Sequence, residues 1–342
     1  MATMLAAVLE APQRFRLEER AVPQPADDDV VIRVARCGIC GTDLHIYRGH
    51  YAADRLPLVP GHEFAGTIAA LGRNVRGLKE GDRVIADINV GCGHCFYCRR
   101  NEVLNCAGVS QIGIHRDGAF AGFVRVPARL VIGLPDTLDF AVAALTEPLA
   151  CVVRAARRSR IGLGESVLVL GAGPIGNLHV QLARLTGAGP VIAADPDPAR
   201  AALAREAGAD AVITDPAAVA ATVRSLTGGR GADIAIEGVG AAALYDTALS
   251  AIRPGGRIAA FGIAGADARW PMPVLDMVLK ETGLQGSVAG MGEDMHIALN
   301  LLALGRIRTE AFTANVYPLA DMTAAMERFA TDRTAFKVQI AA

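Results

Sequence analysis

The densest group of chemically capable residues is a run of cysteines near residue 100. Cys92, Cys95, Cys98 and Cys106 lie within fifteen residues, at gaps of two, two and seven. A loop with this spacing can wrap four thiolates around one zinc ion and complete its tetrahedral shell. We therefore predict a closed, structural zinc site. His94 is interpreted as a bystander, because the four sulfurs leave it no position to fill.

A second set of possible ligands is spread through the first 150 residues. It consists of Cys40, of His62 and Glu63, which are neighbours in the sequence, and of Glu147, which precedes a proline. Separated Cys, His and carboxylate ligands suit a catalytic zinc, where three protein groups hold the metal and water or substrate takes the fourth place. Each residue alone is a weak indication, since a lone cysteine is more often buried in a core.

A glycine-rich turn follows the apolar run at 167–170 and precedes a helical pattern. Its G-x-G-x-x-G spacing lets the backbone turn tightly and approach a pyrophosphate, which then lies against the N-terminus of the helix. This context predicts a dinucleotide site. The predicted cofactor contacts in the turn are Gly171, Gly173, Pro174, Ile175 and Gly176.

Asp195 ends the next apolar run, 24 residues after Gly171. An acid at this place can accept hydrogen bonds from both hydroxyls of the adenosine ribose, and it repels a 2′-phosphate. We therefore predict that the cofactor is NAD rather than NADP. Arg200, which follows closely, keeps NADP from being excluded outright.

The elements that must position these residues change in type near residue 150. Short β-branched or alternating runs bounded by Gly and Pro predict antiparallel β-structure with loops in the first part. From about residue 165, strand, glycine turn and helix alternate, which builds a parallel sheet with helices on both faces. The predicted early strands are 28–36, 64–71 and 81–85; the later elements are strands at 166–170, 191–194, 210–214, 232–236 and 256–261 and a helix at 175–185.

We expect an α/β protein of two domains, since 342 residues suffice for two cores. Residues 1–150 and 288–342 are expected to form a mainly-β catalytic domain, and residues 151–287 a doubly wound parallel-sheet domain. The second segment of the catalytic domain includes predicted helices at 295–304 and 321–329 and a strand at 336–340.

Composition narrows the partners that we expect. The net charge of −1 gives no long-range field that would attract nucleic acid or an anionic membrane. Apolar stretches are interrupted well before the ~20 residues that a membrane span needs. With no basic segment leading an apolar one at the N-terminus, we expect a cytoplasmic protein with reduced cysteines that acts on a small molecule.

The sequence resembles a known family most clearly in two runs. Residues 37–47 read Cys-Gly-Ile-Cys-Gly-Thr-Asp-Leu-His-Ile-Tyr, and residues 60–64 read Pro-Gly-His-Glu-Phe. Both are similar to the medium-chain zinc-dependent alcohol dehydrogenases, in particular to the branch of polyol (sorbitol-type), sugar-acid and threonine dehydrogenases. The similarity covers nearly the whole chain. It implies a GroES-like catalytic domain, a Rossmann domain, one catalytic and one structural zinc per chain, NAD, and a homo-oligomer, either a tetramer or a dimer.

The resemblance also implies roles for the spread ligands. Cys40 and His62 would bind the catalytic zinc, with Glu63 beside it as a ligand or alternate ligand. Glu147 falls where the polyol branch carries Glu, bound to zinc directly or through its water, and where the liver-type branch carries Cys. The resemblance leaves open which glutamate is the direct ligand. Cys151 is a rival ligand, although packing is the commoner role of such a cysteine.

By the same resemblance, the residues around Cys40 move the proton. Thr42 would take the proton of the alcohol, and His45 would pass it through the cofactor ribose to solvent. Asp43 would orient a zinc-bound histidine. Arg200 resembles the arginine that flanks the adenine of NAD. The expected reaction is hydride transfer from a secondary hydroxyl of a polyol or sugar acid to NAD, which gives a ketone.

Several alternatives stay open at this point. Threonine dehydrogenases share the run at 40–47, whereas Glu147-Pro-Leu resembles the polyol and sugar-acid branch. His115 and Arg116 could grip a carboxylate, which would favour sugar acids. A general alcohol dehydrogenase is a further possibility. A zinc-binding regulatory or RNA module would not need the dinucleotide turn, and a zinc-free quinone reductase of the same superfamily would not need the cysteines.

Overall fold

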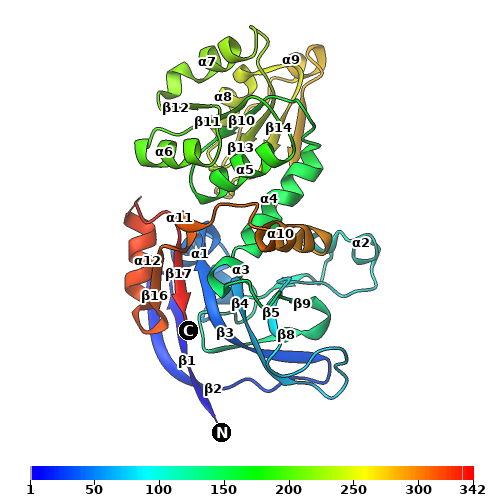
Figure 1. The fold of residues 1–342 in the computed structure, drawn as a ribbon, viewed down its shortest axis with the longest axis vertical. Coiled ribbons are helices and arrows are strands. Elements are labelled where there is room, and N and C mark those ends of the chain that lie inside the picture. The colour runs from blue at the N-terminus through cyan, green and yellow to red at the C-terminus, as the bar shows by residue number, and fades with distance from the viewer. Residues whose placement is uncertain (1, 333) are drawn as a thin grey trace. The chain divides into compact units, whose positions relative to one another are not determined.

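The computed structural model describes residues 2–332 and 334–342, and the chain divides into two compact units. Unit 1 comprises Met1–Ala150, Met291–Gly305 and Thr309–Ala342, and unit 2 comprises Cys151–Gly290 and Arg306–Arg308. In Figure 1 the last part of the chain, in orange and red, lies among the elements of the first unit.

Unit 1 is built on a seven-stranded sheet in the order β16-β17-β3-β4-β5-β9, with β8 paired to β3. The long strand β3 pairs antiparallel with β4, β8 and the late strand β17, so that it ties the start of the chain to its end. The strands of this sheet are β3 (Asp29–Ile39), β4 (Glu63–Leu71), β5 (Arg83–Ala86), β8 (Phe123–Pro127), β9 (Val131–Gly133), β16 (Asn315–Pro318) and β17 (Val338–Ala341).

Two smaller sheets and several short helices complete unit 1. The long helix α4 (Thr146–Ser159) begins in unit 1 and continues into unit 2. The further strands are β1 (Thr3–Ala11), β2 (Arg14–Ala21), β6 (Asn89–Val90) and β7 (Ser110–Gln111). The further helices are α1 (Gly41–Tyr47), α2 (Phe96–Arg99), α3 (Phe140–Ala143), α10 (Glu293–Ala303), α11 (Glu310–Thr313) and α12 (Met322–Thr331).

Unit 2 contains a six-stranded parallel sheet in the order β12-β11-β10-β13-β14-β15. The chain starts in the middle at β10, moves outward to β12, and then returns to β13 on the other side, which is the doubly wound order. The strands are β10 (Val167–Leu170), β11 (Val191–Ala194), β12 (Ala211–Ile213), β13 (Ala232–Glu237), β14 (Ile252–Ala260) and β15 (Gly283–Gly286); the helices are α5 (Pro174–Leu185), α6 (Pro198–Glu206), α7 (Val219–Leu226), α8 (Leu244–Ala251) and α9 (Val274–Leu279).

Successive side chains of β10 point to opposite faces of the sheet, so they contribute to two different cores of unit 2. Val167 and Val169 pack in a cluster with residues of α5 and α6, whereas Leu168 and Leu170 pack in a cluster with residues of α7 and α8. Helices therefore cover both faces of the sheet, and the predicted α/β fold class is confirmed.

The largest difference from a predicted strand boundary is at the start of β14. The sequence predicts a strand at 256–261, but β14 starts at Ile252. Pro254-Gly255-Gly256 resembles a turn, yet the strand continues through it, because the pairing of β13 with β14 shifts register between Ala232 and Ile234. Such a bulge absorbs extra residues without ending a strand.

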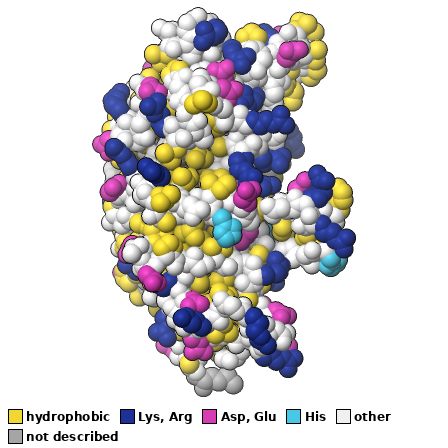
Figure 2. Space-filling view, turned by 45° about the vertical axis from the view of Figure 1, so that its right-hand side comes forward, with side chains coloured by type: hydrophobic (Ala, Val, Ile, Leu, Met, Phe, Trp, Pro, Cys, Tyr) yellow, Lys and Arg dark blue, Asp and Glu magenta, His cyan; other side chains and the backbone are white. Residues whose placement is uncertain are grey.

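The surface of unit 2 has a notable apolar feature at α9. Val274, Leu275, Val278 and Leu279 are each at least 65% exposed, and β15 lies at the edge of the sheet. Figure 2 shows hydrophobic side chains gathered near the top of the view, where Figure 1 places α9.

Within the described residues, no helix has both the length and the apolar character needed to cross a membrane.

Candidate functional site

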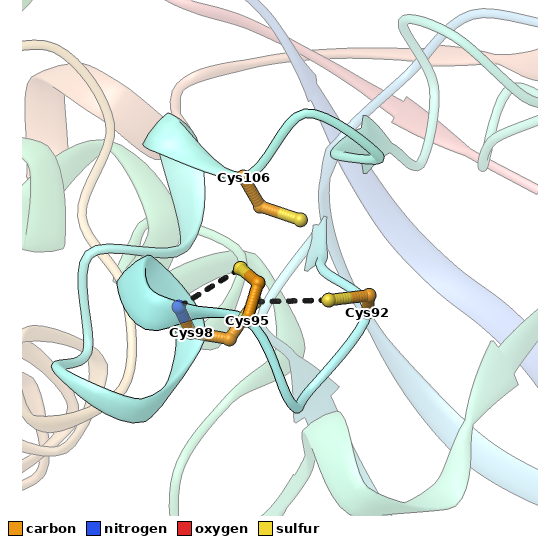
Figure 3. A group of neighbouring side chains, drawn as sticks. All are labelled: Cys92, Cys95, Cys98 and Cys106. Atoms are coloured by element: carbon orange, nitrogen blue, oxygen red, sulfur yellow. Dashed lines mark hydrogen bonds between the residues drawn. The ribbon is translucent and has the colours of Figure 1, made fainter.

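The four cysteines of the loop at 92–106 surround a common space (Figure 3). Their sulfurs all lie within 4.8 Å of one another, and Cys92 Sγ is 3.9 Å from Cys98 Sγ. A disulfide would require about 2.05 Å, whereas a tetrahedron of Zn–S bonds of about 2.3 Å has edges of roughly 3.8 Å. The geometry therefore fits one zinc ion held by four sulfurs.

The local backbone of this loop favours the thiolate form of Cys92. Cys95 caps the N-terminus of α2, where its sulfur accepts a hydrogen bond from Cys98 N at 3.5 Å. Backbone N–H groups of His94 and Cys95 lower the pKa of Cys92 to about 6. His94 itself is exposed, lies with its Nδ1 2.9 Å from Cys92 O, and is not part of the sulfur cluster.

A second cluster brings together Cys40, His62 and Glu63, whose ligand atoms also lie within 4.8 Å of one another. Cys40 directly follows β3 and caps α1, and His62 and Glu63 stand at the start of the paired strand β4. Cys40 Sγ is 3.1 Å from His62 Nε2. One sulfur, one nitrogen and one carboxylate converge, which suits a three-ligand zinc with an open fourth place.

Cys40 would have to bind a metal as a thiolate, against the effect of its burial. Burial raises the pKa of the Cys40 thiol above its ordinary value, although His62 beside it opposes the shift. A bound divalent cation would reverse this effect, because a coordinating thiol is deprotonated outright. The donor types and their spacing thus fit the predicted catalytic zinc.

Asp43 connects two members of the cluster. Its side chain is fully buried, its Oδ2 accepts a hydrogen bond from Cys40 N at 3.0 Å, and its Oδ1 lies 3.3 Å from His62 Nδ1. A carboxylate on the far nitrogen of a histidine fixes the ring and leaves Nε2 free to face a metal. The position of Asp43 beside Nδ1 therefore fits an orienting role.

Lys337 is a member of this site that sequence reasoning missed. Its ammonium contacts Glu63 Oε2, and the side chains of Lys337 and Glu63 are only 4% and 1% exposed. The sequence contained one signal, because Lys337 is the only charged residue in the apolar run at 335–342. A lysine inside such a run must be buried with a partner or break the strand pattern.

The dinucleotide turn has the backbone that its glycines predict. Gly171 adopts φ +92°, a conformation that other residues rarely take, and Gly173 caps the N-terminus of α5. A Cβ at Gly176 would lie 1.8 Å from Gly171 O, so the helix can approach the strand this closely only with glycine. The turn therefore directs the N-terminus of α5 beyond the carboxyl end of β10.

Asp195 and Arg200 lie beside this turn. Asp195 is buried, its Oδ2 accepts a hydrogen bond from Ala172 N at 2.8 Å, and its Oδ1 accepts one from Asp197 N at 2.9 Å. A Cβ on Gly173 would lie 3.8 Å from Arg200 Nη1, so the guanidinium flanks the glycine turn. Each carboxylate oxygen of Asp195 keeps a further lone pair for a ligand hydroxyl.

Two family models match the chain. Residues 26–136 match the alcohol dehydrogenase GroES-like domain, and residues 174–303 match the zinc-binding dehydrogenase model. L-galactonate-5-dehydrogenase of Escherichia coli K12 is 34% identical over 96% of both chains.

The chain belongs to the zinc-binding alcohol dehydrogenase family. Other relatives in this dehydrogenase family differ in their named substrates. Sorbitol dehydrogenase of Bacillus subtilis 168 is 33% identical over 95% of this chain and 93% of its own. L-threonine 3-dehydrogenase of Pyrococcus abyssi is 36% identical over 77% of each chain.

Solved structures of the family match this dehydrogenase over its full length. A zinc-binding dehydrogenase of Sinorhizobium meliloti 1021, bound to NADP, has a TM-score of 0.92 at 32% identity and covers 100% of both chains. A structure described as a short chain alcohol dehydrogenase of Escherichia coli CFT073, complexed with NADH, has a TM-score of 0.92 at 27% identity with the same coverage. The protein is thus an enzyme of the dehydrogenase type, and the regulatory-module alternative is set aside.

The other predicted residues of the dehydrogenase site lie as follows. Thr42 is half-buried near the start of α1 and donates its backbone N–H to Cys40 Sγ at 3.2 Å. His45 faces the ring of His50 at 6.2 Å between centroids, and burial lowers the pKa of His45. Glu147 is buried in the first turn of α4 but is not part of the three-residue ligand cluster. Its direct ligation stays a prediction.

Cys151, the rival ligand, has a different partner. Its buried sulfur accepts a hydrogen bond from Gly290 N at 3.3 Å, and it is in neither metal-ligand cluster of the described residues. This contact ties α4 to the segment that follows β15, which is a packing role.

Proposed function

We propose that the protein is a zinc-dependent dehydrogenase that transfers a hydride from a secondary hydroxyl of a polyol or sugar acid to NAD and releases a ketone. The observation that carries the proposal is the cluster of Cys40, His62 and Glu63. A zinc held by three protein ligands would keep its fourth place for a substrate oxygen. Its relatives include an L-galactonate and a sorbitol dehydrogenase.

The chain's own residues supply binding and proton transfer in this proposal. When bound, zinc supplies a Lewis acid for the substrate oxygen, and NAD accepts the hydride. Thr42 receives the proton of the hydroxyl, and His45 passes it toward solvent. Asp43 keeps the ring of His62 in place through its position beside Nδ1. Burial lowers the pKa of His45, which keeps its ring neutral near pH 7 and able to accept a proton.

A sugar acid is supported by the loop at 113–118. This loop is tied to the segment that leads to His62: Gly118 N donates to Val59 O, and Ala119 N, directly after the loop, donates to Gly61 O. His115 in the loop lies edge-on to Tyr51, with 6.5 Å between ring centroids, and its Nδ1 is 3.2 Å from the backbone N–H of Gln111. Because Nδ1 accepts this hydrogen bond, the neutral ring carries its single proton on Nε2, which can donate to a carboxylate or hydroxyl.

L-threonine is the second candidate substrate, favoured by the 36% identity to a threonine 3-dehydrogenase. Steady-state kinetics with NAD across polyols, sugar acids, threonine and simple alcohols tests the choice. We expect the highest kcat/KM for a polyol or sugar acid, because a second hydroxyl can orient the substrate at the metal. If threonine or a primary alcohol exceeds all of them, the substrate class is wrong, although the metal and cofactor proposals remain.

The NAD preference rests on Asp195, and Asp195→Ala tests it. We expect kcat/KM for NAD to fall about 10- to 100-fold, the range for losing a hydrogen bond to a charged group. The ratio of kcat/KM for NAD to kcat/KM for NADP should therefore become smaller. Asp195→Asn is the matched control, because it removes the charge but can still accept from Ala172 N. It should admit NADP better than wild type while disturbing the turn less. A wild-type enzyme that uses NADP more efficiently would contradict the role of Asp195.

A homo-oligomer, dimer or tetramer, stays a prediction. The exposed apolar side chains of α9 and the unpaired edge of β15 support it, since contiguous apolar patches and open strand edges are sites of association.

A further inference from the structure

Glu237 is a buried acid that the proposed chemistry does not use. It is the last residue of β13, and its exposure is 0%. Strand β13 lies next to β10 in the sheet, on the side opposite β11. The carboxyl ends of β10 and β13 thus flank the point where the strand order reverses, which is where doubly wound sheets bind their ligands.

The side chain of Glu237 holds the segment that follows it. Its Oε1 accepts hydrogen bonds from Val239 N at 2.9 Å and Gly240 N at 2.8 Å, with Ala241 N at 3.4 Å. Its backbone oxygen accepts from Phe261 N and Gly262 N, at 3.1 and 2.9 Å. One residue therefore fastens the loops after β13 and β14 to each other.

The segment held by Glu237 lies directly against the dinucleotide turn. A Cβ on Gly171 would lie 2.4 Å from Val239 Cγ2, so the side chain of Val239 covers the first glycine of the turn. Gly238 N also donates to Leu170 O at 3.1 Å. Val239 is nevertheless 55% exposed. Its free face is an apolar surface beside the glycine turn.

We propose that Glu237 is a positioning residue for the dinucleotide: it fixes the segment 238–240 so that Val239 presents an apolar surface to the cofactor next to Gly171. The inference rests on the dinucleotide part of the proposed function and is independent of the substrate. Glu237 acts through Val239, because its own carboxylate is buried beneath the segment.

The structure separates the role of the hydrogen bonds from that of the charge. All three N–H groups are bound by Oε1, and the buried Oε2 has no hydrogen-bond partner among the residues that the structure describes. Glutamine at this position keeps an oxygen for the three N–H groups and loses only the charge. Alanine loses the acceptor and leaves those N–H groups without a partner.

Titration of the zinc-loaded protein with NADH, followed by fluorescence without substrate, tests the proposal. Glu237→Ala should raise the Kd for NADH about tenfold or more and raise KM for NAD, while zinc content and KM for the alcohol stay unchanged. Glu237→Gln should recover most of the affinity, to within about threefold of wild type. NADH affinity in a folded Glu237→Ala protein within about twofold of wild type would overturn the proposal.

A second variant keeps the test decisive if Glu237→Ala does not fold. Val239→Ala removes an exposed side chain, so the melting temperature should stay near that of wild type while the Kd for NADH rises about threefold. Leu226→Ala is the control, because Leu226 is also exposed, at 44%. It is the last residue of α7, six residues before β13 begins, whereas Val239 follows the end of β13. Equal NADH affinity in both variants and wild type would contradict the proposal. Wild-type protein that binds no NADH would instead contradict the proposed cofactor.

Discussion

Cys40→Ser should lose one of two zinc ions per chain and nearly all turnover, and it should keep the fold. The cluster of Cys40, His62 and Glu63 offers three ligands to one metal, and loss of the sulfur leaves two. A Lewis acid contributes several kcal/mol to the transition state, so kcat/KM should fall by about 1000-fold or more. Metal analysis, circular dichroism and steady-state kinetics on the same preparations measure the three effects.

Cys98→Ser is the matched comparison, since it removes one sulfur from the other metal cluster. That cluster is closed and structural, so loss of its metal should reduce stability rather than act on the chemistry, because the binding energy of a structural zinc is folding energy. We expect Cys98→Ser to have a lower melting temperature than Cys40→Ser and to unfold at a lower urea concentration. Equal loss of structure in the two variants would undo the division into a catalytic and a structural site. Wild-type protein without zinc would favour the quinone reductase alternative.

Lys337→Met should destabilise the protein by about 3–5 kcal/mol, the usual cost of leaving one partner of a buried ion pair without the other. Glu63 is 1% exposed and would lose the ammonium that contacts its Oε2. Methionine is similar in length to lysine, so the loss reflects charge more than volume. Urea unfolding of the zinc-loaded protein measures the change in the free energy of unfolding.

Lys280→Met provides the control for that experiment. Lys280 pairs with Asp276 at 2.9 Å, but both side chains are about half exposed, and such surface pairs are worth about 0–1 kcal/mol. The double variant Glu63→Gln with Lys337→Met removes both charges and should recover part of the stability. If Lys337→Met unfolds at the same urea concentration as Lys280→Met, the pair with Glu63 does not stabilise the site.

Motifs that are local in the sequence were predictable in detail. The four cysteines lie in one loop, and their spacing alone indicated a common metal, which the 3.9 Å between two of the sulfurs fits. The glycine turn was equally readable, since tight backbone approach depends on residues within six positions. The alternation of strands and helices after residue 165 likewise predicted the doubly wound sheet, because hydrophobic periodicity reflects which faces are covered.

Contacts between distant segments could not be predicted in this way. Lys337 meets Glu63 only because β17 pairs with β3, which in turn pairs with β4. The two residues are 274 positions apart, and nothing in the sequence between them indicates which strand the end of the chain will pair with. A single charged residue in an apolar run shows that a partner is needed, but not which residue supplies it.

The family resemblance, the fold class, the closed cysteine cluster and the dinucleotide turn could all be predicted from the amino-acid sequence, because each depends on residue types at short spacing or on periodicity. The folded structure was needed to place Cys40 3.1 Å from His62, to bring Lys337 against Glu63, and to show that Glu237 holds Val239 over the glycine turn. The physical reason is that strand pairing and loop packing at a sheet edge bring together groups whose positions the chain's local preferences leave free.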